Sequence, residues 1–360
     1  MENYLVSSSP HITSPRTTRN IMLDVIIALV PCVIASVLIY GLYPLVSILL
    51  CVGSAVFAEW LFNLIRKKPQ TVGDLSAVVT GVILGLNLPA VVPLFVPVIG
   101  AFFAIIIVKM LFGGIGKNFA NPAITARIFL VLAWGGVMTS YVLPINLANG
   151  AGELVKYLSE AFNINLPAAI TSATPLASVK AAIESGANPA NGLSALNMFL
   201  GNIGGSAGEV STLAVLIGGV YLAVRKVIDV KIPIIYIGTT AIFTAIFFAN
   251  SGYVGEYVWT YMLGGGLVFG AVFMATDYAT TPNTNLGRII FACGCGFLTV
   301  IIRKFSTMPE GVSFAILLMN IVSPLIEKII PKPYGHPKRS MMDYFAEKKA
   351  QKVAKGGSNV

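Results

Sequence analysis

Long stretches of apolar residues, separated by short polar segments, run along most of the chain. They cover residues 21–39, 45–65, 75–88, 92–112 and 123–141, and then 210–224, 232–249, 258–275, 289–302 and 312–330. A helix of about 20 apolar residues crosses the roughly 30 Å hydrocarbon core of a bilayer, and most stretches approach that length. The pattern therefore predicts an all-α polytopic membrane protein with about ten transmembrane helices.

Short motifs recur in the two sets of stretches. Residues 73–76 (Gly-Asp-Leu-Ser) resemble 208–211 (Gly-Glu-Val-Ser), and Asn121-Pro122 before Arg127 resembles Pro282-Asn283 before Arg288. Because five spans turn the second copy over, we predict two inverted repeats of five helices. The predicted divisions are residues 1–20 (N-terminal segment), 21–141 (first membrane repeat), 142–207 (a long polar loop), 208–330 (second membrane repeat) and 331–360 (basic tail).

Composition agrees with a membrane protein. The chain of 360 residues is 56% hydrophobic and only 11% charged, whereas soluble domains carry about 25% charged residues. The net charge of +9 does not indicate a nucleic-acid partner, because the basic residues lie between the apolar stretches and in the tail. Placing both termini in the cytoplasm of a bacterial or archaeal cell puts about 20 of the 24 Lys and Arg residues on or near the inner side.

The same orientation places the central polar loop on the extracytoplasmic side, with Lys156, Lys180, Arg303 and Lys304. Within that loop, Pro175 suits the first position of a helix and Thr174 suits its N-cap, so we predict a short helix over 177–184, closed by Gly186. The N-H groups and dipole of a helix start favour a phosphate there. The alternative is an ordinary capping threonine with no ligand.

The residues around this cap resemble a flavin acceptor. Thr171-Ser172-Ala173-Thr174 is similar to the [Ser/Thr]-Gly-Ala-Thr motif of the RnfD/NqrB family of membrane subunits of redox-driven ion pumps, with Ser172 in place of Gly and Ala168 in place of a frequent Asp. Further motifs that resemble the RnfD branch are Ser9-Pro10-His11, Asn121-Pro122-Ala123, Ala275-Thr276-Asp277, Pro309-Glu310-Gly311-Val312 and Leu318-Met319-Asn320. The resemblance runs from about residue 9 to about residue 335.

This resemblance implies a role in an electron-transport complex, that of an oxidoreductase and translocase subunit that couples electron transfer between ferredoxin and NAD to Na⁺ or H⁺ translocation. It implies covalent FMN on Thr174, with Thr171, Ser172, Ala173 and Pro175 around the phosphate and Lys180 offsetting its charge. It also implies a non-covalent riboflavin, a flavin transferase, partner subunits with iron–sulfur clusters and a second covalent FMN, and the inverted-repeat fold. No nicotinamide or ferredoxin site is visible in this chain.

Several polar residues in or beside the apolar stretches have two interpretations. Asp24 and Glu59 belong either to an ion route or a subunit contact, or to the membrane interface, where Asp24 lies near Arg19 at a helix start. A second group either lines a flavin pocket or ion path, or caps and packs helices: Asn121, Arg127, Thr276, Asp277, Thr280 and Asn283. The run Gly264-Gly265-Gly266 favours close helix packing, not a phosphate loop.

The cysteines and histidines offer no metal site. Cys32, Cys51, Cys293 and Cys295 all lie in apolar stretches and are expected to be buried thiols, and His11 and His336 are far apart in sequence. Two other functions remain open: a cofactor-free channel or secondary transporter of the same fold, and a purely structural anchor in a complex. A covalently bound flavin on Thr174 would separate the redox function from both.

Overall fold

The computed structural model describes residues 16–142, 144, 174–185, 188–189, 193–209, 211–306 and 311–329. Within these residues the protein is all-α, with one isolated antiparallel bridge between Pro89 and Ser206. The predicted site residues Thr171, Ser172 and Ala173 lie outside the described residues.

The first set of helices extends up to residue 138. It comprises α1 (Thr18–Tyr40), α2 (Tyr43–Ile65), the 3₁₀ turn η1 (Val72–Asp74), α3 (Ser76–Leu86), α4 (Phe95–Phe102) continued by the π-helix η2 (Phe103–Met110), α5 (Pro122–Ala133) and α6 (Gly135–Met138). Polar caps begin two of these helices: the Thr17 side chain accepts a hydrogen bond from Asn20 N, and Asn121 Oδ1 accepts one from Ala123 N at 3.0 Å. The predicted capping role of Asn121 is thereby confirmed.

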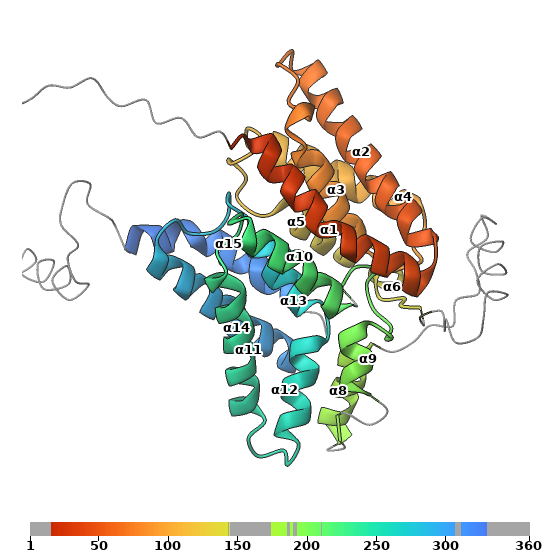
Figure 1. The fold of residues 1–360 in the computed structure, drawn as a ribbon, viewed down its shortest axis with the longest axis vertical. Coiled ribbons are helices and arrows are strands. Elements are labelled where there is room, and N and C mark those ends of the chain that lie inside the picture. The colour runs from red at the N-terminus through yellow and green to blue at the C-terminus, as the bar shows by residue number, and fades with distance from the viewer. Residues whose placement is uncertain are drawn as a thin grey trace, which may run out of the picture.

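A second set follows the central segment. It comprises α8 (Pro175–Ser185), α9 (Ala195–Leu200), α10 (Thr212–Val224), α11 (Lys231–Phe247), α12 (Val254–Leu263), α13 (Leu267–Phe269) continued by the π-helix η4 (Gly270–Met274), α14 (Asn285–Phe305) and α15 (Val312–Ile329). In Figure 1 the helices up to α6 form one group, in red to yellow, and α10 to α15 form another, in green to blue, with α8 and α9 beside α12.

Among the described residues, three helices are long and apolar enough to cross a membrane: α1, α2 and α14. A fourth span results if α12 and the segment Leu267–Met274, bent by 54° at a short break, are counted as one. Shorter apolar helices occupy other predicted stretches: α3, α4 with η2, α5, α10 and α11. The multi-pass character is thus confirmed, while the count of about ten spans and the inverted repeat stay predictions.

Small residues bring helices of the core into close contact. A Cβ on Gly81 of α3 would lie 2.7 Å from Val52 Cα of α2, and one on Gly218 of α10 would lie 2.2 Å from the Ala28 carbonyl oxygen of α1. Only glycine permits these approaches. Because α1 belongs to the first group and α10 to the second, the Gly218 contact joins the two groups.

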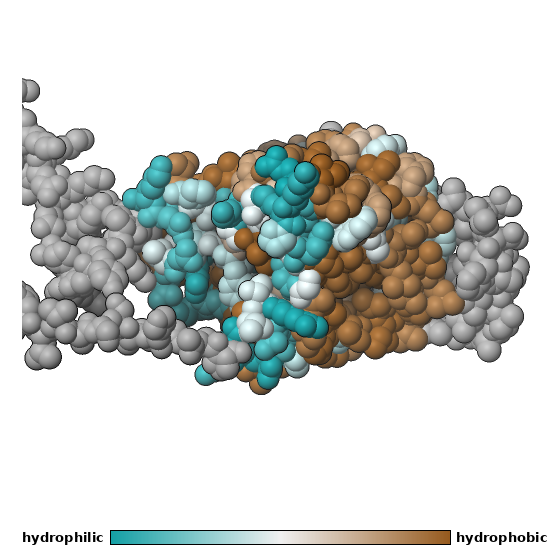
Figure 2. Space-filling view, turned by 90° about the horizontal axis from the view of Figure 1, so that it is seen from above, coloured by the Kyte–Doolittle hydropathy of each residue, from teal (hydrophilic) through white to brown (hydrophobic). Residues whose placement is uncertain are grey.

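The outer surface carries apolar side chains where lipid is expected. Exposed residues at helical spacing form one face of α1: Leu23, Ile27, Val30, Ile34 and Leu38. Figure 2 shows hydrophobic residues over much of the face in view and hydrophilic residues gathered toward one end. This division is the one expected of a protein that lies in a bilayer.

The predicted span over residues 258–275 is interrupted. Residues Gly264, Gly265 and Gly266, called here the glycine break, separate α12 from α13, and Gly265 and Gly266 have φ of 61° and 64°. The prediction that this glycine run lies within a continuous span was therefore wrong. Left-handed backbone at two successive positions ends the helix, and glycine adopts it without a steric penalty.

Candidate functional site

The Thr174 helix begins as the sequence predicts. Ala177 N donates to Thr174 Oγ1 at 3.2 Å, and Pro175 is the first residue of α8. The capping role is confirmed, although the helix extends over Pro175–Ser185 and not only 177–184. Thr174 is 7% exposed. Pro175 has no N-H group, and the N-H groups of Ala177 and Ser178 donate to Thr174 itself, so Leu176 N is the remaining donor of the first turn, beside a buried hydroxyl.

Thr174 lines a small cavity between α8 and the glycine break. The other lining residues come from α8, from the segment before α10, from the end of α12 and from the break: Pro175, Leu176, Ile203, Gly204, Gly205, Ser206, Glu209, Leu263, Gly265 and Gly266. Glu209 is the single charged residue among them. The cavity therefore combines two hydroxyl side chains, a carboxylate and bare glycine backbone.

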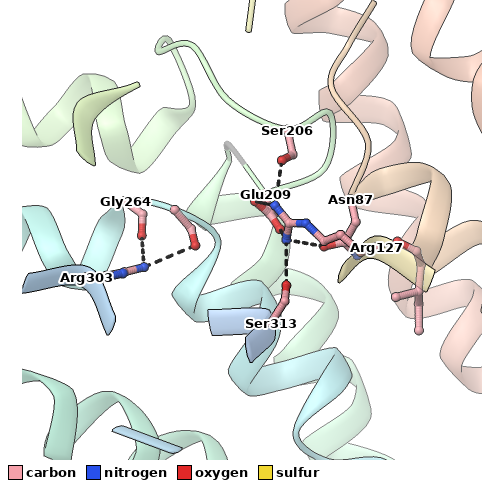
Figure 3. Close-up of polar contacts among 9 residues, drawn as sticks. Asn87, Arg127, Ser206, Glu209, Gly264, Arg303 and Ser313 are labelled. Atoms are coloured by element: carbon pink, nitrogen blue, oxygen red, sulfur yellow. Dashed lines mark hydrogen bonds and ion pairs between the residues drawn. The ribbon is translucent and has the colours of Figure 1, made fainter. Parts of the chain in front are cut away.

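A buried ion pair forms one side of this site. Arg127 of α5 pairs with Glu209, and its guanidinium also donates to Asn87 Oδ1 at 2.9 Å and Ser313 Oγ at 3.2 Å. A further bond runs from Arg127 Nη2 to Ser206 Oγ at 3.3 Å. Both charged side chains are 5% exposed. Figure 3 shows these side chains converging on Arg127 from different elements.

A second buried arginine holds the glycine break from the other side. Arg303 of α14 donates to the carbonyl oxygen of Tyr261, to that of Gly264 at 2.9 Å and to that of Gly265 at 3.2 Å. These carbonyls end α12, where the helix dipole favours a positive charge. Figure 3 shows Arg303 and the Arg127 cluster on opposite sides of the break.

A larger cavity, of about 790 Å³ including space open to solvent, lies between the two helix groups. It gathers three of the predicted polar residues, Asn121, Thr276 and Asp277, together with Lys109 and Ser76. Arg127 is not among its lining residues, because it pairs with Glu209 instead. Whether these residues line a flavin pocket or an ion path stays a prediction.

Lys109 of η2 and Glu59 of α2 form another buried ion pair. Lys109 Nζ lies 2.8 Å from Glu59 Oε2 and donates to Ser76 Oγ at 2.6 Å, and Thr71 Oγ1 donates to Glu59 Oε1. Glu59 is fully buried. Its partner, Lys109, comes from this chain. Whether the pair lies at the membrane interface or on an ion route stays a prediction.

The other polar predictions find partners nearby. Asp24 accepts hydrogen bonds from Tyr221 at 3.0 Å and from Arg225 at 3.3 Å, so its partners come from α10 and the residue that follows it, whereas the sequence suggested Arg19. Thr280 donates to Asp277 at 3.4 Å. Asn283 donates to Glu327. These contacts fit the capping and packing interpretation.

Lys180 Nζ donates to the Ser306 carbonyl oxygen at 2.6 Å, at the end of α14. Its role of offsetting charge at Thr174 stays a prediction. Lys304 likewise donates to the Phe247 carbonyl, so the basic residues predicted to share one side of the membrane lie at neighbouring helix ends. The side of the membrane on which these basic residues lie stays a prediction.

Cys32, Cys51 and Cys295 are buried as predicted, whereas Cys293 is partly exposed. Among the described residues no group of three or more His, Cys, Asp or Glu side chains is placed to hold a metal ion.

An ion pair at the α10–α11 connection lies nearer the surface. Asp229 accepts from Lys231 N at 3.2 Å and from Arg288 Nη1 at 2.8 Å. Burial on its own raises the pKa of Asp229, but the hydrogen bond from Lys231 N and the Arg288 guanidinium outweigh it, so the pKa of this carboxyl is lowered overall.

Sequence reasoning missed Glu209, Arg303 and Lys109 as members of buried networks. A signal was present, because each is a charged residue inside or beside an apolar stretch, where a charge requires a partner. Their partners are distant in sequence: Glu209 is 82 residues from Arg127, Arg303 is 39 residues from Gly264, and Lys109 is 50 residues from Glu59. Without the fold these pairs could not be assigned.

The fold and these buried contacts define the class: an all-α membrane protein in which buried ionic networks join two groups of apolar helices. The chain belongs to the NQR2, RnfD, RnfE family, whose family model matches residues 5–335. The family resemblance predicted from the motifs is confirmed.

Similar proteins carry consistent names, and three of them bear the same subunit designation. The chain is 45% identical over 328 residues to a subunit of the Na(+)-translocating ferredoxin:NAD(+) oxidoreductase complex of Acetobacterium woodii, covering 91% of this chain and 93% of that protein. It is 39% identical over 337 residues to the corresponding subunit of the proton-translocating ferredoxin:NAD(+) oxidoreductase complex of Clostridium ljungdahlii, covering 92% and 96%. It is 33% identical over 348 residues to that of the ion-translocating oxidoreductase complex of Citrobacter koseri, covering 92% and 99%.

Proposed function

We propose that this chain is the RnfD-type membrane subunit of an ion-translocating ferredoxin:NAD oxidoreductase complex and that it carries FMN joined through its phosphate to Thr174. In that complex, electron transfer between ferredoxin and NAD drives Na⁺ or H⁺ across the membrane. The observation that carries the first part is the alignment, over 91–92% of this chain, with three relatives that bear the same subunit designation.

The second part is supported by the position of Thr174. Its hydroxyl caps α8 and lines a cavity with Ser206 and the glycine break. A phosphoester at this oxygen lies at the start of α8, where the N-H group of Leu176 and the helix dipole favour an anion. Glycine backbone along the cavity allows a ligand to approach closely.

The residues present therefore fit a phosphate-linked group. Thr174 supplies the oxygen that bears it, the start of α8 supplies the Leu176 N-H group, and Ser206 supplies a hydroxyl that is itself bonded to Arg127. Arg127 balances the charge of Glu209, so the cavity does not present an unpaired carboxylate to the phosphate. FMN, when bound, supplies the redox chemistry, and covalent attachment keeps it at a fixed place in the protein.

The proposal extends to the arrangement of the chain in the membrane. The Thr174 segment lies on the extracytoplasmic side and both termini lie in the cytoplasm. A flavin transferase makes the bond, and the partner subunits carry iron–sulfur clusters and a second covalent FMN. The proposal also includes a non-covalent riboflavin in this subunit and an inverted-repeat arrangement of about ten spans.

The test is covalent flavin fluorescence of the full chain on a denaturing gel after co-expression with an active flavin transferase. We expect a fluorescent band for the wild type, none for Thr174→Ala, and a band for Thr284→Ala. Thr284 is the matched control because its hydroxyl caps α14 through Gly287 N at 3.0 Å, so the substitution removes a helix cap of the same kind. Intact-mass analysis of the peptide containing Thr174 places the bond.

A wild-type band that stays dark while the transferase labels a known acceptor protein contradicts the flavin proposal. It favours the second candidate, a cofactor-free channel or secondary transporter. The observation that supports this second function is the cavity between the helix groups, which is lined by Lys109, Asn121 and Asp277 among others. Ion flux through liposomes containing the chain alone then becomes the measurement that tests it.

A further inference from the structure

Side chains of opposite charge lie beside the two ends of the glycine break. On the α12 side, Arg303 donates to the last carbonyls, those of Tyr261, Gly264 and Gly265. On the α13 side, the carboxylate of Glu209 occupies the space beside Gly266, where an added Cβ would lie 2.4 Å from Glu209 Cδ. A cation at a helix C-terminus and an anion at a helix N-terminus both stabilise those ends. Arg303 therefore holds the backbone at the end of α12, and Glu209 leaves no room for a side chain at position 266.

The start of α8 packs directly on this backbone. An added Cβ on Gly265 would lie 2.2 Å from Leu176 Cδ1, and one on Gly264 would lie 3.5 Å from Leu176 Cδ2. Leu176 is 4% exposed and follows Thr174 by two residues. Only a residue without a side chain at position 265 lets Leu176 come this close. The place of Leu176 on the break therefore determines where the Thr174 hydroxyl lies.

We infer that the glycine break is the surface that positions Thr174 for attachment of the flavin phosphate, with Gly265 as the positioning residue. The inference rests on the proposed function. In the transfer, with FAD as the donor, Thr174 Oγ1 forms a bond to the phosphorus on the flavin side, the pyrophosphate bond breaks, AMP leaves and the hydroxyl proton is released. No electrons are exchanged in this step.

The geometry explains why position matters for the transfer. The attacking oxygen has to lie in line with the bond that breaks, and displacements of about 1 Å reduce such rates by about a hundredfold. A methyl group at position 265 overlaps Leu176 Cδ1. Because Leu176 is buried, its branched end has little space to rotate into, and the start of α8 shifts away from the break. Thr174 then keeps its hydroxyl and its helix but is displaced.

The experiment measures the rate of covalent flavin attachment to the full chain in membranes, with purified flavin transferase and FAD. We expect Gly265→Ala to slow attachment at least tenfold. Gly252→Ala is the matched control: Gly252 has φ of 76° and nothing lies within 4 Å of its added Cβ, so it carries a comparable backbone strain without the contact. We expect Gly252→Ala to remain within twofold of the wild type.

A double-mutant cycle separates the Leu176 contact from other effects of the methyl group, including its approach to 3.0 Å from Arg303 Nη2. In a Leu176→Ala background the overlap is gone, and Gly265→Ala is expected to slow attachment less than threefold. Melting temperatures of all four variants in the same detergent show whether each is folded.

Each outcome decides the matter. Wild-type attachment that Gly265→Ala leaves unchanged overturns the inference and leaves the proposed function standing. A tenfold loss that persists in the Leu176→Ala background, in protein that melts like Gly252→Ala, also overturns it. A wild-type chain that takes up no flavin contradicts the proposed function, and the inference fails with it.

Discussion

Substituting Glu209 by Gln tests how much the buried pair with Arg127 contributes to stability. The substitution keeps the shape and one acceptor oxygen but leaves the guanidinium without its counter-charge at 5% exposure. Removing one partner of a buried pair costs about 3–5 kcal/mol. Arg127 keeps its bonds to Asn87, Ser206 and Ser313, so we expect the lower end, about 3 kcal/mol.

A stability change of this size is measurable by thermal unfolding. A loss of about 1 kcal/mol in the free energy of unfolding lowers the melting temperature by about 2–4 °C in a domain of 150–250 residues, and by less in a larger one. For Glu209→Gln we therefore expect a melting temperature roughly 5 °C below that of the wild type. The buried thiols of Cys32, Cys51 and Cys295 become accessible on unfolding, and a thiol-reactive dye follows the transition. All variants are heated at one scan rate, because unfolding of membrane proteins is seldom reversible.

The control is Asp229→Asn, which breaks the more exposed pair with Arg288. That pair is expected to contribute about 1 kcal/mol or less. Replacing both members of the inner pair, Arg127→Met with Glu209→Leu, is expected to be more stable than Glu209→Gln, because no buried charge remains. If Glu209→Gln melts within 1 °C of Asp229→Asn, in repeated scans with an error near 0.3 °C, the burial argument is refuted.

Three further outcomes follow from contacts described above. Gly81→Ala is expected to destabilise by about 1–3 kcal/mol through overlap with α2, whereas Gly53→Ala, with nothing within 4 Å, is expected to be neutral or slightly stabilising; paired thermal melts compare them. Lys109→Met is expected to cost about 3 kcal/mol by leaving Glu59 buried without a counter-charge, and Lys109→Met with Glu59→Gln is expected to recover part of it in the same assay. Because the pKa of Asp229 is lowered in the folded state, its carboxylate stabilises the fold at pH values above the ordinary Asp pKa of about 3.9. This contribution is lost as the pH falls through the lower folded-state pKa. In thermal melts from pH 6 to pH 3, the difference in melting temperature between the wild type and Asp229→Asn is expected to disappear at the acid end.

Hydropathy located the helices well because an apolar run in this chain is almost always a helix. The run at residues 45–65 is α2, Tyr43–Ile65, and the run at 312–330 is α15, Val312–Ile329. Caps were equally readable, since Thr174 before Pro175 and Asn121 before Pro122 are local signals that need no tertiary structure.

The helix break and the buried pairs could not be predicted in the same way. A glycine run inside an apolar stretch has the same composition whether or not it ends the helix; the predicted close packing is confirmed by the approach of Leu176, but the break itself follows only from φ at Gly265 and Gly266. Glu59 and Arg127 were recognised as polar residues in apolar surroundings, but their partners depend on which helices lie side by side. The motif residues Thr171 to Ala173 lie outside the described residues, so their part of the site stays a prediction.

The contact between α2 and α3 has a mechanical consequence for the protein. Gly81 and Gly85 bring the α3 backbone against Val52 and Ile48 with no side chains between them, so α3 cannot slide or rotate without a steric clash. Asn87 follows α3 directly, so the close fit of α3 also fixes the amide oxygen that accepts a hydrogen bond from Arg127.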